Sequence, residues 1–566
     1  MKKISIAMMC LSTVIFGTPT PILSHNAIHH PVKGTHGMVS SQEKIASNIG
    51  LNVLKKGGNA IDAAVAMGFA LAVTHPQAGN LGGGGFMLIY LANTNQTIAL
   101  DFRETAPHLA SKNMFLNEFN NVDHNKSQFS IYSVGVPGSV SGLLTALNQF
   151  GTLPRQDVLK PAIKLAKKGI IVSEELSNSL FRSEQRLKKD PYLSSIFYPN
   201  NHPPKPGERL KQSDLAKSLK QISSKGQRAF YEGEIATKIV NFMKKKQGLI
   251  TKRDLKDYRS ILRRPIQGSY RDYKIYSMPP PSSGGISLMQ LLKLIEPFPL
   301  QEWGHNSTKT IHVMSEAMQL VYADRAEWLG DEDFVSVPKT ELLSPPYLNQ
   351  RHKQINTNKH KKSTTTNHGI PYESDETTHY SVMDQWGNAV SVTTTLNFSY
   401  GVGFAVPGTG IILNNEMDDF SAKPGIPNAY GLIGNKRNEI APKKRMLSSM
   451  TPTIVLKGNN VFLVTGTPGG SRIITTVAQI ISNIIDHKMN IAEASNAARF
   501  HHQWLPDELR IEQHGFSPDT LHQLKSMGHT IKIKRTMGST QSIHKIGNKL
   551  YGSSDPRTPS GKAIGY

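Results

Sequence analysis

Two threonines of a predicted β-hairpin are the residues of this chain best placed to do covalent chemistry. Segment 377–396 has the pattern of a strand, a five-residue turn and a second strand, with Gly387 where a three-residue loop needs a positive φ. Counting back from the turn places Thr377 opposite Thr395, and directly opposed residues share a face with Cβ atoms about 4.5–5.5 Å apart. Two hydroxyl groups should therefore meet there, with Asn397 diagonally beside them.

A hydroxyl group becomes a nucleophile when a base activates it, and the hairpin itself offers no base. Cleavage of the chain before Thr377 would create one, because a free α-amino group has a pKa of about 7.7–8.0. An ordinary Thr-rich hairpin explains the same residues without chemistry, since Thr is a good strand former. The hairpin by itself leaves both interpretations open.

Short motifs elsewhere in the chain favour the first interpretation. They are Thr-Thr-His-Tyr-Ser-Val (377–382), Leu-Asn-Asn-Glu-Met-Asp-Asp-Phe (413–420), Leu-Ser-Ser-Met-Thr-Pro (447–452), Gly-Thr-Pro-Gly-Gly-Ser-Arg (466–472), Phe-His-His-Gln-Trp-Leu-Pro-Asp (500–507), Gly-Asn-Leu-Gly-Gly-Gly-Gly-Phe (79–86) and Leu-Asp-Phe-Arg (100–103). In these motifs, which run through nearly the whole chain after roughly the first 30 residues, the sequence resembles the gamma-glutamyltranspeptidases. That family consists of N-terminal nucleophile hydrolases that cleave themselves to expose a catalytic Thr.

The resemblance implies a reaction. Thr377 would first attack the carbonyl group of Glu376 and so become a new N-terminus. Its hydroxyl would then form a γ-glutamyl acyl-enzyme from glutathione or another γ-glutamyl amide, and water, an amino acid or a peptide would accept the acyl group. No cofactor would take part. Thr395 would orient and activate the nucleophile, and the hairpin register indicates the same pairing.

A γ-glutamyl group carries an α-carboxylate and an α-ammonium, so its pocket needs a cationic fork and at least one anion. An arginine suits the carboxylate, because its planar guanidinium binds a carboxylate through two hydrogen bonds. Taken singly, such residues are more often a surface salt bridge, helix-capping serines and a solvated acidic turn. With the resemblance, the assigned residues are Arg103, Ser448 and Ser449 for the carboxylate and Asn397, Glu416 and Asp419 for the ammonium.

Glycines are candidates for binding the developing oxyanion. Gly469 and Gly470 are expected to donate backbone N–H groups to it, because glycine permits the unusual dihedral angles of such a nest. An isolated Gly-Gly pair is usually a turn, so this assignment rests on the resemblance. The run from Gly82 to Gly85 lacks the spacing of a phosphate-binding loop and is assigned to packing near the site.

The resemblance also implies a fold, the four-layer αββα sandwich, whereas the sequence pattern alone supports a mixed α+β protein with partly antiparallel sheets. Residues 28–376 would form a large subunit and residues 377–566 the small catalytic subunit, and the two would remain associated as a heterodimer. Within the large subunit, residues 351–376 are polar and basic, which predicts a mobile linker before the cleavage point.

Local signals predict individual elements. Ser40 and Glu43 have the spacing of a capping box, which would open a helix. Asn59 is suited to cap a second helix over residues 60–73, which is apolar on all sides and should be buried. Residues 86–102 predict two strands around a turn.

Residues 1–27 have the features of a signal peptide, with Lys2 and Lys3 before an apolar run over residues 4–16. The run is shorter than the ~20 residues that span a bilayer as a helix, and no later apolar stretch reaches that length. We therefore expect an exported protein, periplasmic or secreted, without a stable membrane anchor. The only cysteine, Cys10, lies in this segment, so the mature chain should have no thiol chemistry.

The formal net charge of +23 suggests nucleic acid as a partner. However, the Lys and Arg residues lack the aromatic interleaving of single-strand binders. A solvated face and a basic linker explain the charge, so no nucleic-acid partner is predicted.

Histidine pairs are the candidates for metal binding. Adjacent residues of a strand point to opposite faces, which separates the members of His29-His30 and of His501-His502. No carboxylate spacing accompanies either pair, and no metal site is predicted.

Three further residues match or depart from the pattern of the family that the chain resembles. Tyr430 lies in the region of a lid loop that many bacterial family members have, and it is a candidate for covering the site. Met446 stands where the family usually has proline, and Thr467 where it often has serine. Neither is expected to touch a proposed contact.

Other functions share part of this pattern. Acylases acting on glutaryl cephalosporins and enzymes that process polyglutamate resemble the chain in its Thr and its glycine pair, but the ammonium-binding set favours γ-glutamyl donors. A basic, non-enzymatic surface-binding protein is the alternative of a different class. Such a protein would gain nothing from a Thr at a cleavage point.

Overall fold

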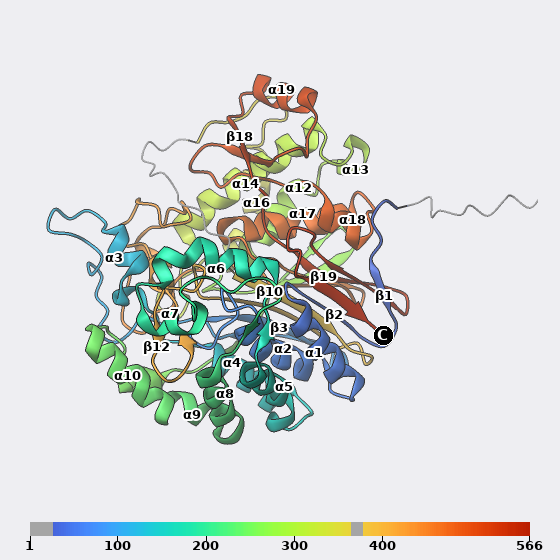
Figure 1. Cartoon of the computed structure of the whole chain (residues 1–566). Helices are drawn as coiled ribbons and strands as arrows, with labels where there is room; N and C mark the ends of the chain where they lie inside the picture. Colours follow the sequence, from blue (N-terminus) through green and yellow to red (C-terminus); the bar gives the residue numbers. More distant parts are fainter. Residues whose placement is uncertain (1–26, 364–376) are drawn as a thin grey trace, which may run out of the picture.

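The computed structural model describes residues 27–363 and 377–566, which form one layered body (Figure 1). Two seven-stranded sheets lie face to face, and helices cover the outer surface of each. The four-layer αββα sandwich implied by the resemblance is confirmed.

The first sheet contains the predicted hairpin at its centre. In order across the sheet, its strands are β21 (Lys562–Gly565), β2 (Met38–Ser41), β10 (Thr377–Met383), β11 (Ala389–Thr395), β3 (Gly84–Leu91), β4 (Gln96–Asp101) and β7 (Ile261–Arg263). The second sheet consists of β1 (Val32–Gly34), β20 (Lys549–Ser554), β19 (Gln541–Ile546), β15 (Asn460–Thr465), β14 (Thr453–Lys457), β9 (Tyr273–Ser277) and β8 (Ile266–Tyr270). Each sheet thus combines strands that precede and follow position 377.

Helices of the two outer layers come from different parts of the chain. The layer on the first sheet and its extension contains α1 (Lys44–Lys55), α2 (Ala60–Thr74), α4 (Ser139–Phe150), α5 (Arg155–Lys168), α6 (Glu174–Leu187), α7 (Pro191–Phe197), α8 (Ser213–Lys225), α9 (Gln227–Tyr231), α10 (Glu234–Lys246) and α11 (Lys252–Asp257). The layer on the second sheet contains α12 (Gly284–Ile295), α14 (Thr308–Trp328), α17 (Ile473–Ile485) and α18 (Ile491–Asn496), with α13 (Leu300–Trp303), α15 (Lys339–Leu342), α16 (Pro345–His352) and α19 (Pro518–Ser526) around it.

The described residues also contain short elements. They are α3 (His124–Phe129), the paired strands β5 (Ile170–Ile171) and β6 (Arg209–Leu210), the paired strands β12 (Ala405–Val406) and β13 (Ile411–Ile412), the small sheet of β16 (Phe500–His501), β17 (Leu509–Glu512) and β18 (Ile531–Lys534), and the 3₁₀ helices η1 (Ile131–Ser133), η2 (Glu416–Asp419), η3 (Lys436–Asn438) and η4 (Gly470–Arg472).

Local predictions succeed for elements whose own composition indicates that they are buried. Every residue of α2 is buried, and Asn59 caps the helix by accepting hydrogen bonds from the backbone N–H groups of Ile61 and Asp62. Strands β3 and β4 pair antiparallel, as the pattern over residues 86–102 predicts. The glycines before β3 are tightly packed, since a Cβ on Gly83 would lie 2.1 Å from the carbonyl oxygen of Thr395.

The first helix begins later than its capping box predicts. Ser40 lies in β2, where its backbone pairs with β10 on one side and β21 on the other. The cap of α1 is Glu43, whose side chain accepts a hydrogen bond from the backbone N–H of Ala46. The prediction that Ser40 caps this helix is wrong, because the sheet ladder already uses the backbone at that position.

The prediction of a mobile linker over residues 351–376 is wrong for the part that the structure describes. Arg351 lies in α16 and donates a hydrogen bond to Asp324 of α14 at 2.6 Å. His360 is 7% exposed, and its ring contacts two carboxylates. Buried polar contacts therefore fasten residues 351–363, although the segment contains few apolar residues. Residues 364–376 lie outside the described residues.

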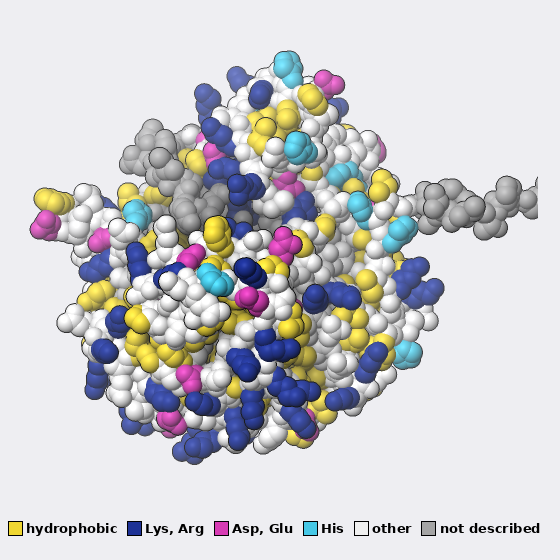
Figure 2. Space-filling view, in the orientation of Figure 1, with side chains coloured by type: hydrophobic (Ala, Val, Ile, Leu, Met, Phe, Trp, Pro, Cys, Tyr) yellow, Lys and Arg dark blue, Asp and Glu magenta, His cyan; other side chains and the backbone are white. Residues whose placement is uncertain are grey.

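The predicted signal peptide, residues 1–27, lies almost wholly outside the described residues. Among the helices of residues 27–363 and 377–566, none is long and apolar enough to cross a membrane. Lys and Arg side chains are spread over the face seen in Figure 2, most densely in its lower part, where α5, α8 and α9 lie.

Candidate active site

The hairpin has the register that the sequence predicts. β10 pairs with β11 with Thr377 opposite Thr395, and Gly387 has a φ of 88° in the turn. The hydroxyl of Thr377 donates a hydrogen bond to Oγ1 of Thr395 across 3.5 Å, and both side chains are buried. The strand backbone alone therefore brings the two hydroxyl groups together.

Asn397 extends this pair into a chain of polar contacts. Its backbone N–H donates to Oγ1 of Thr395 at 2.8 Å, which fixes that oxygen beside Thr377. Its φ of 72° is left-handed, a conformation that Asn adopts more readily than most residues. The hydroxyl oxygen of Tyr430 lies 2.9 Å from the carbonyl oxygen of Asn397 and 2.5 Å from its Oδ1. Tyr430, 6% exposed, thus covers one side of the site.

The glycine pair lies under this tyrosine. Gly469 and Gly470 have φ angles of 133° and 54°, which favour glycine. A Cβ on Gly470 would lie 2.5 Å from Cδ1 of Tyr430, so no other side chain fits there. Gly470 opens a 3₁₀ turn that continues directly into α17. The backbone N–H groups of the pair therefore lie at the positive end of a helix dipole, which favours negative charge.

A buried ion-pair cluster also lines the pocket. The guanidinium of Arg103 donates from Nη1 to Glu416 and from Nη2 to Asp419. Burial raises the pKa of the Glu416 carboxyl well above its usual value. It also raises the pKa of Asp419, although Arg103 opposes both shifts. Sequence reasoning assigned these residues to different ends of a substrate. The structure instead places them in direct contact, each charge compensating the other.

Two charged residues near this cluster escaped the sequence analysis. Arg325 is buried in α14 and donates from Nη2 to Oγ of Ser449 at 3.2 Å. Glu104 lies 3.7 Å from Arg103, and burial raises its pKa to about 7. Arg325 falls on the buried stripe of α14 that includes Met318. The signal that could have identified Arg325 in the sequence is a charged residue on an otherwise apolar helix face.

Ser448 makes contacts through both its backbone and its hydroxyl. The carbonyl oxygen of Ser448 accepts hydrogen bonds from the backbone N–H and the hydroxyl of Ser283, at 2.8 and 2.7 Å. Its hydroxyl oxygen accepts from the N–H of Met450 at 3.1 Å. These contacts hold the turn that carries Ser449 against the pocket.

One pocket collects most of the predicted site. Its cavity is small, about 20 Å³, because its own polar side chains fill it. It is lined by Thr377, Thr395, Asn397, Arg103, Glu416, Asp419, Ser448, Ser449, Gly470, Tyr430 and Arg325, with Leu432, Leu447, Met450 and Ile473. Gly469 precedes the lining residue Gly470, and Glu376 lies outside the described residues.

Comparison with known proteins identifies the family. The family model described as Gamma-glutamyltranspeptidase matches residues 46–565. The chain belongs to the gamma-glutamyltranspeptidase family. It is 50% identical over 579 residues to a glutathione hydrolase proenzyme of Escherichia coli, a match that covers 100% of this chain and 99% of the relative. The resemblance found in the motifs is confirmed, and with it the N-terminal nucleophile hydrolase class.

Relatives with another name are also similar. An acylase ACY 1 proenzyme of a Pseudomonas strain is 38% identical, covering 91% of this chain and 90% of the relative. Among solved structures, a cephalosporin acylase from Bacillus halodurans matches with a TM-score of 0.84 at 26% identity, over 98% of this chain and 99% of that one. A gamma-glutamyltranspeptidase from Helicobacter pylori matches with a TM-score of 0.54 at 46% identity, over 55% of this chain and 90% of that one.

Two smaller predictions about individual residues are wrong. Met446 does touch a proposed contact, because its carbonyl oxygen accepts from Nε of Arg103 at 3.3 Å. His502 does have a carboxylate partner, since its Nε2 lies 3.2 Å from Asp507. The chain reverses at Trp504, whose φ is 69°, and so returns Asp507 to His502. Strand periodicity does not apply across such a turn.

Proposed function

We propose that the chain is a self-cleaving gamma-glutamyltransferase and glutathione hydrolase. Thr377 takes the γ-glutamyl group from glutathione or another γ-glutamyl amide and passes it to water, an amino acid or a peptide. The single observation that carries the proposal is that the Thr377–Thr395 pair and the Arg103–Glu416–Asp419 cluster line one pocket. Among the relatives, the Escherichia coli protein, named a glutathione hydrolase proenzyme, supports it.

Maturation comes first in the proposed sequence. The hydroxyl of Thr377 attacks the carbonyl carbon of Glu376, and the acyl group moves from nitrogen to oxygen. This shift breaks the amide bond and frees the α-amino group of Thr377, and water then hydrolyses the ester, which releases the carboxylate of Glu376 and restores the hydroxyl of Thr377. Residues 28–376 and 377–566 remain together as a heterodimer, because both contribute neighbouring strands to each sheet.

Acyl transfer uses the amine that maturation creates. The neutral α-amino group of Thr377 accepts the proton of its own hydroxyl as Oγ1 attacks the γ-carbonyl carbon of the donor. The N–H groups of Gly469 and Gly470 stabilise the oxyanion, and they need no reorganisation because their dihedral angles are already set. The amine product leaves with that proton. Thr395, held by the N–H of Asn397, keeps Oγ1 in position.

Recognition of the donor exchanges one set of ion pairs for another. The α-carboxylate of the substrate binds the guanidinium of Arg103, with Ser448 and Ser449 alongside. The α-ammonium binds Glu416 and Asp419, which Arg103 would otherwise neutralise. A zwitterionic donor therefore leaves none of these buried charges without a partner, whereas a donor lacking either charge leaves some uncompensated.

An acylase that accepts glutaryl amides is the second candidate, favoured by the similarity to the acylase ACY 1 proenzyme. The test compares γ-glutamyl and glutaryl anilides with the purified protein, after Edman sequencing of its smaller fragment. We expect the sequence Thr-Thr-His-Tyr and a preference for the γ-glutamyl donor of roughly tenfold to more than a hundredfold in kcat/KM. Equal turnover of both anilides would favour the acylase, and an uncut chain would exclude the maturation step.

Export is part of the proposal. Residues 1–27 have the charge and apolar pattern of a signal peptide, so the mature enzyme is expected in the periplasm or the medium. Fractionation of cells, followed by N-terminal sequencing of the larger fragment, tests this. A larger fragment that starts at residue 1 or 2 in the cytoplasm would contradict it.

A further inference from the structure

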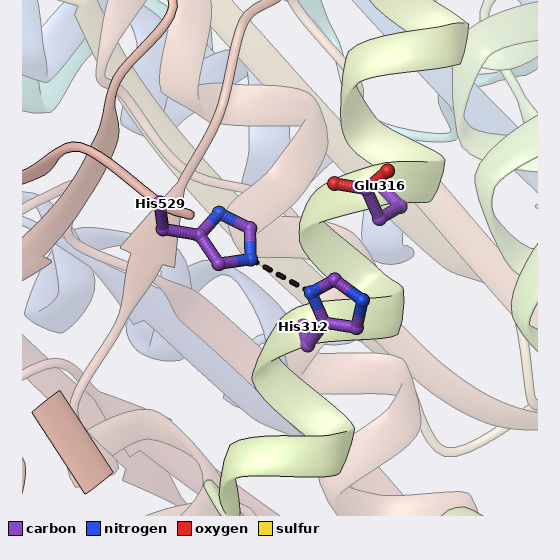
Figure 3. Close-up of side chains that lie close together, drawn as sticks. All are labelled: His312, Glu316 and His529. Atoms are coloured by element: carbon purple, nitrogen blue, oxygen red, sulfur yellow. Dashed lines mark hydrogen bonds between the residues drawn. The ribbon is translucent and has the colours of Figure 1, made fainter. Parts of the chain in front are cut away.

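Three buried side chains outside the active-site pocket converge on one point (Figure 3). His312 and Glu316 lie one turn apart on α14, and His529 lies in the loop between α19 and β18. The three are 0%, 2% and 4% exposed. Each offers one ligand atom, and these atoms lie within 4.8 Å of one another. No step of the proposed reaction uses them.

Hydrogen bonding fixes which ring nitrogen of His312 carries the proton. Its Nε2 lies 2.6 Å from the carbonyl oxygen of Asn356, and a carbonyl oxygen only accepts. The proton is therefore on Nε2, and Nδ1 presents a lone pair. That lone pair faces Nε2 of His529 at 2.7 Å, so a single proton lies between the two rings. A backbone carbonyl that holds the far nitrogen is the arrangement found around metal-bound histidines.

The carboxylate of Glu316 is also held in place from behind. Its Oε1 lies 2.6 Å from Nδ1 of His360, and its Oε2 accepts from the backbone N–H of Lys361 at 3.2 Å. A carboxylate has about four lone-pair positions, so these contacts leave it able to bind a cation. The group is thus oriented without being saturated.

We propose that Nδ1 of His312, Nε2 of His529 and the carboxylate of Glu316 form a binding site for a divalent transition-metal ion of the zinc class. Two imidazole nitrogens and one carboxylate oxygen are ligands that zinc prefers, with water in the fourth position. Tetrahedral zinc with bonds of about 2.0–2.1 Å keeps ligand atoms roughly 3.3 Å apart. The two nitrogens need to separate by a few tenths of an ångström each. The ion replaces the shared proton, which moves to Nδ1 of His529.

A second group nearby has a different character. It consists of His360, His502 and Asp507. Nε2 of His360 lies 3.1 Å from Oδ1 of Asp507, and Nε2 of His502 lies 3.2 Å from the same oxygen. However, the backbone N–H of Trp504 donates to Nδ1 of His502, so Nε2 of that ring keeps its proton and donates to Asp507. His360 faces a carboxylate from each of its nitrogens. The two rings of this group therefore lack the free nitrogen lone pairs that a metal needs, and His360 instead supports Glu316 from behind.

The proposed ion would join the two halves of the chain. His312 and Glu316 precede the proposed cleavage point, and His529 follows it. A ligand that binds only the folded state stabilises that state in proportion to its occupancy. Zinc is therefore expected to hold the two fragments together without entering the reaction.

The test uses the full purified protein, stripped with a chelator and then titrated with zinc alone. Calorimetry and metal analysis after desalting should give one zinc per chain, and the midpoint of thermal unfolding should rise by a few degrees. His529→Gln should abolish both effects, whereas His522→Gln, an exposed histidine on α19, should change neither. Turnover of a γ-glutamyl anilide should be the same with and without zinc.

Several results would overturn the assignment. Wild-type protein that retains no stoichiometric zinc would show that the residues form a hydrogen-bonded cluster only. Zinc binding that survives in His529→Gln but is lost in His502→Gln would move the ion to the second group. Should His529→Gln fail to fold, His312→Gln and Glu316→Gln provide the same test, and unchanged zinc binding in either would be equally decisive.

Discussion

The candidate active site has two sides that are built in different ways. On the reacting side, Thr377 and Thr395 are neighbours in a regular antiparallel ladder, and their contact follows from backbone pairing. On the recognition side, Arg103, just after β4, meets Glu416 and Asp419 of a short 3₁₀ helix through side-chain charges. The first arrangement is insensitive to what the side chains are, whereas the second exists only because the charges compensate one another.

This difference separates stability from chemistry. Removing the hydroxyl of Thr377 deletes one hydrogen bond of 3.5 Å, which is worth at most about 1 kcal/mol. Breaking a buried ion pair by removing one partner typically costs about 3–5 kcal/mol. The recognition side is therefore expected to contribute to folding as well as to binding, and the reacting side almost only to catalysis.

The largest expected effect is on the reacting side. Thr377→Ala should remain a single uncut chain on denaturing electrophoresis, and its turnover of a γ-glutamyl anilide should fall by roughly 10³-fold or more. Its thermal unfolding midpoint should stay close to that of the uncut wild type, because little packing is lost. A variant that matures normally would remove Thr377 from the mechanism.

Arg103→Lys tests the recognition side at constant charge. A lysine cannot make the two-pronged contact of a guanidinium, so KM should rise by roughly tenfold to a hundredfold while kcat changes little. Thr395→Ala should show the reverse, a lower kcat after correction for incomplete maturation. Arg271→Lys, at an ion pair with Asp486 that does not line the pocket, is the matched control. Equal effects on both parameters in both variants would erase the distinction between the two sides.

Neutralising the acidic pair should change which donor is preferred. The double variant Glu416→Gln with Asp419→Asn removes the partners of the substrate ammonium, so the preference for γ-glutamyl over glutaryl anilides should shrink by about tenfold. The measurement is the ratio of the two kcat/KM values. A ratio that does not change would show that the ammonium binds elsewhere.

Tyr430→Phe is expected to have the smallest effect. It removes the hydroxyl that lies beside both oxygens of Asn397 but keeps the ring over Gly470. One neutral hydrogen bond is worth about 0.5–1.5 kcal/mol, which corresponds to a two- to tenfold loss in kcat/KM. Tyr430→Ala, which also uncovers the glycine pair, should lose more. If the two variants behaved alike, the ring would have no covering role.

Sequence reasoning was reliable wherever one local rule determined the geometry. The turn at Gly387 fixes the register of β10 and β11, and a period of two then places Thr377 beside Thr395. The same locality explains the buried helix α2 and its cap at Asn59. Sequence reasoning failed for the capping role of Ser40, because the partner strands of β2 lie far away in the sequence.

The sequence by itself thus determined the pairing of Thr377 with Thr395 and, through its motifs, the family. Only the tertiary structure decided that Arg103 pairs with Glu416 and Asp419, that Arg325 joins the pocket and that His312 meets His529. Arg103 and Glu416 are 313 positions apart, and His312 and His529 are 217 apart. No local dihedral preference links residues at such separations. Their contacts depend on the order of strands in the sheets and on the helices packed against them.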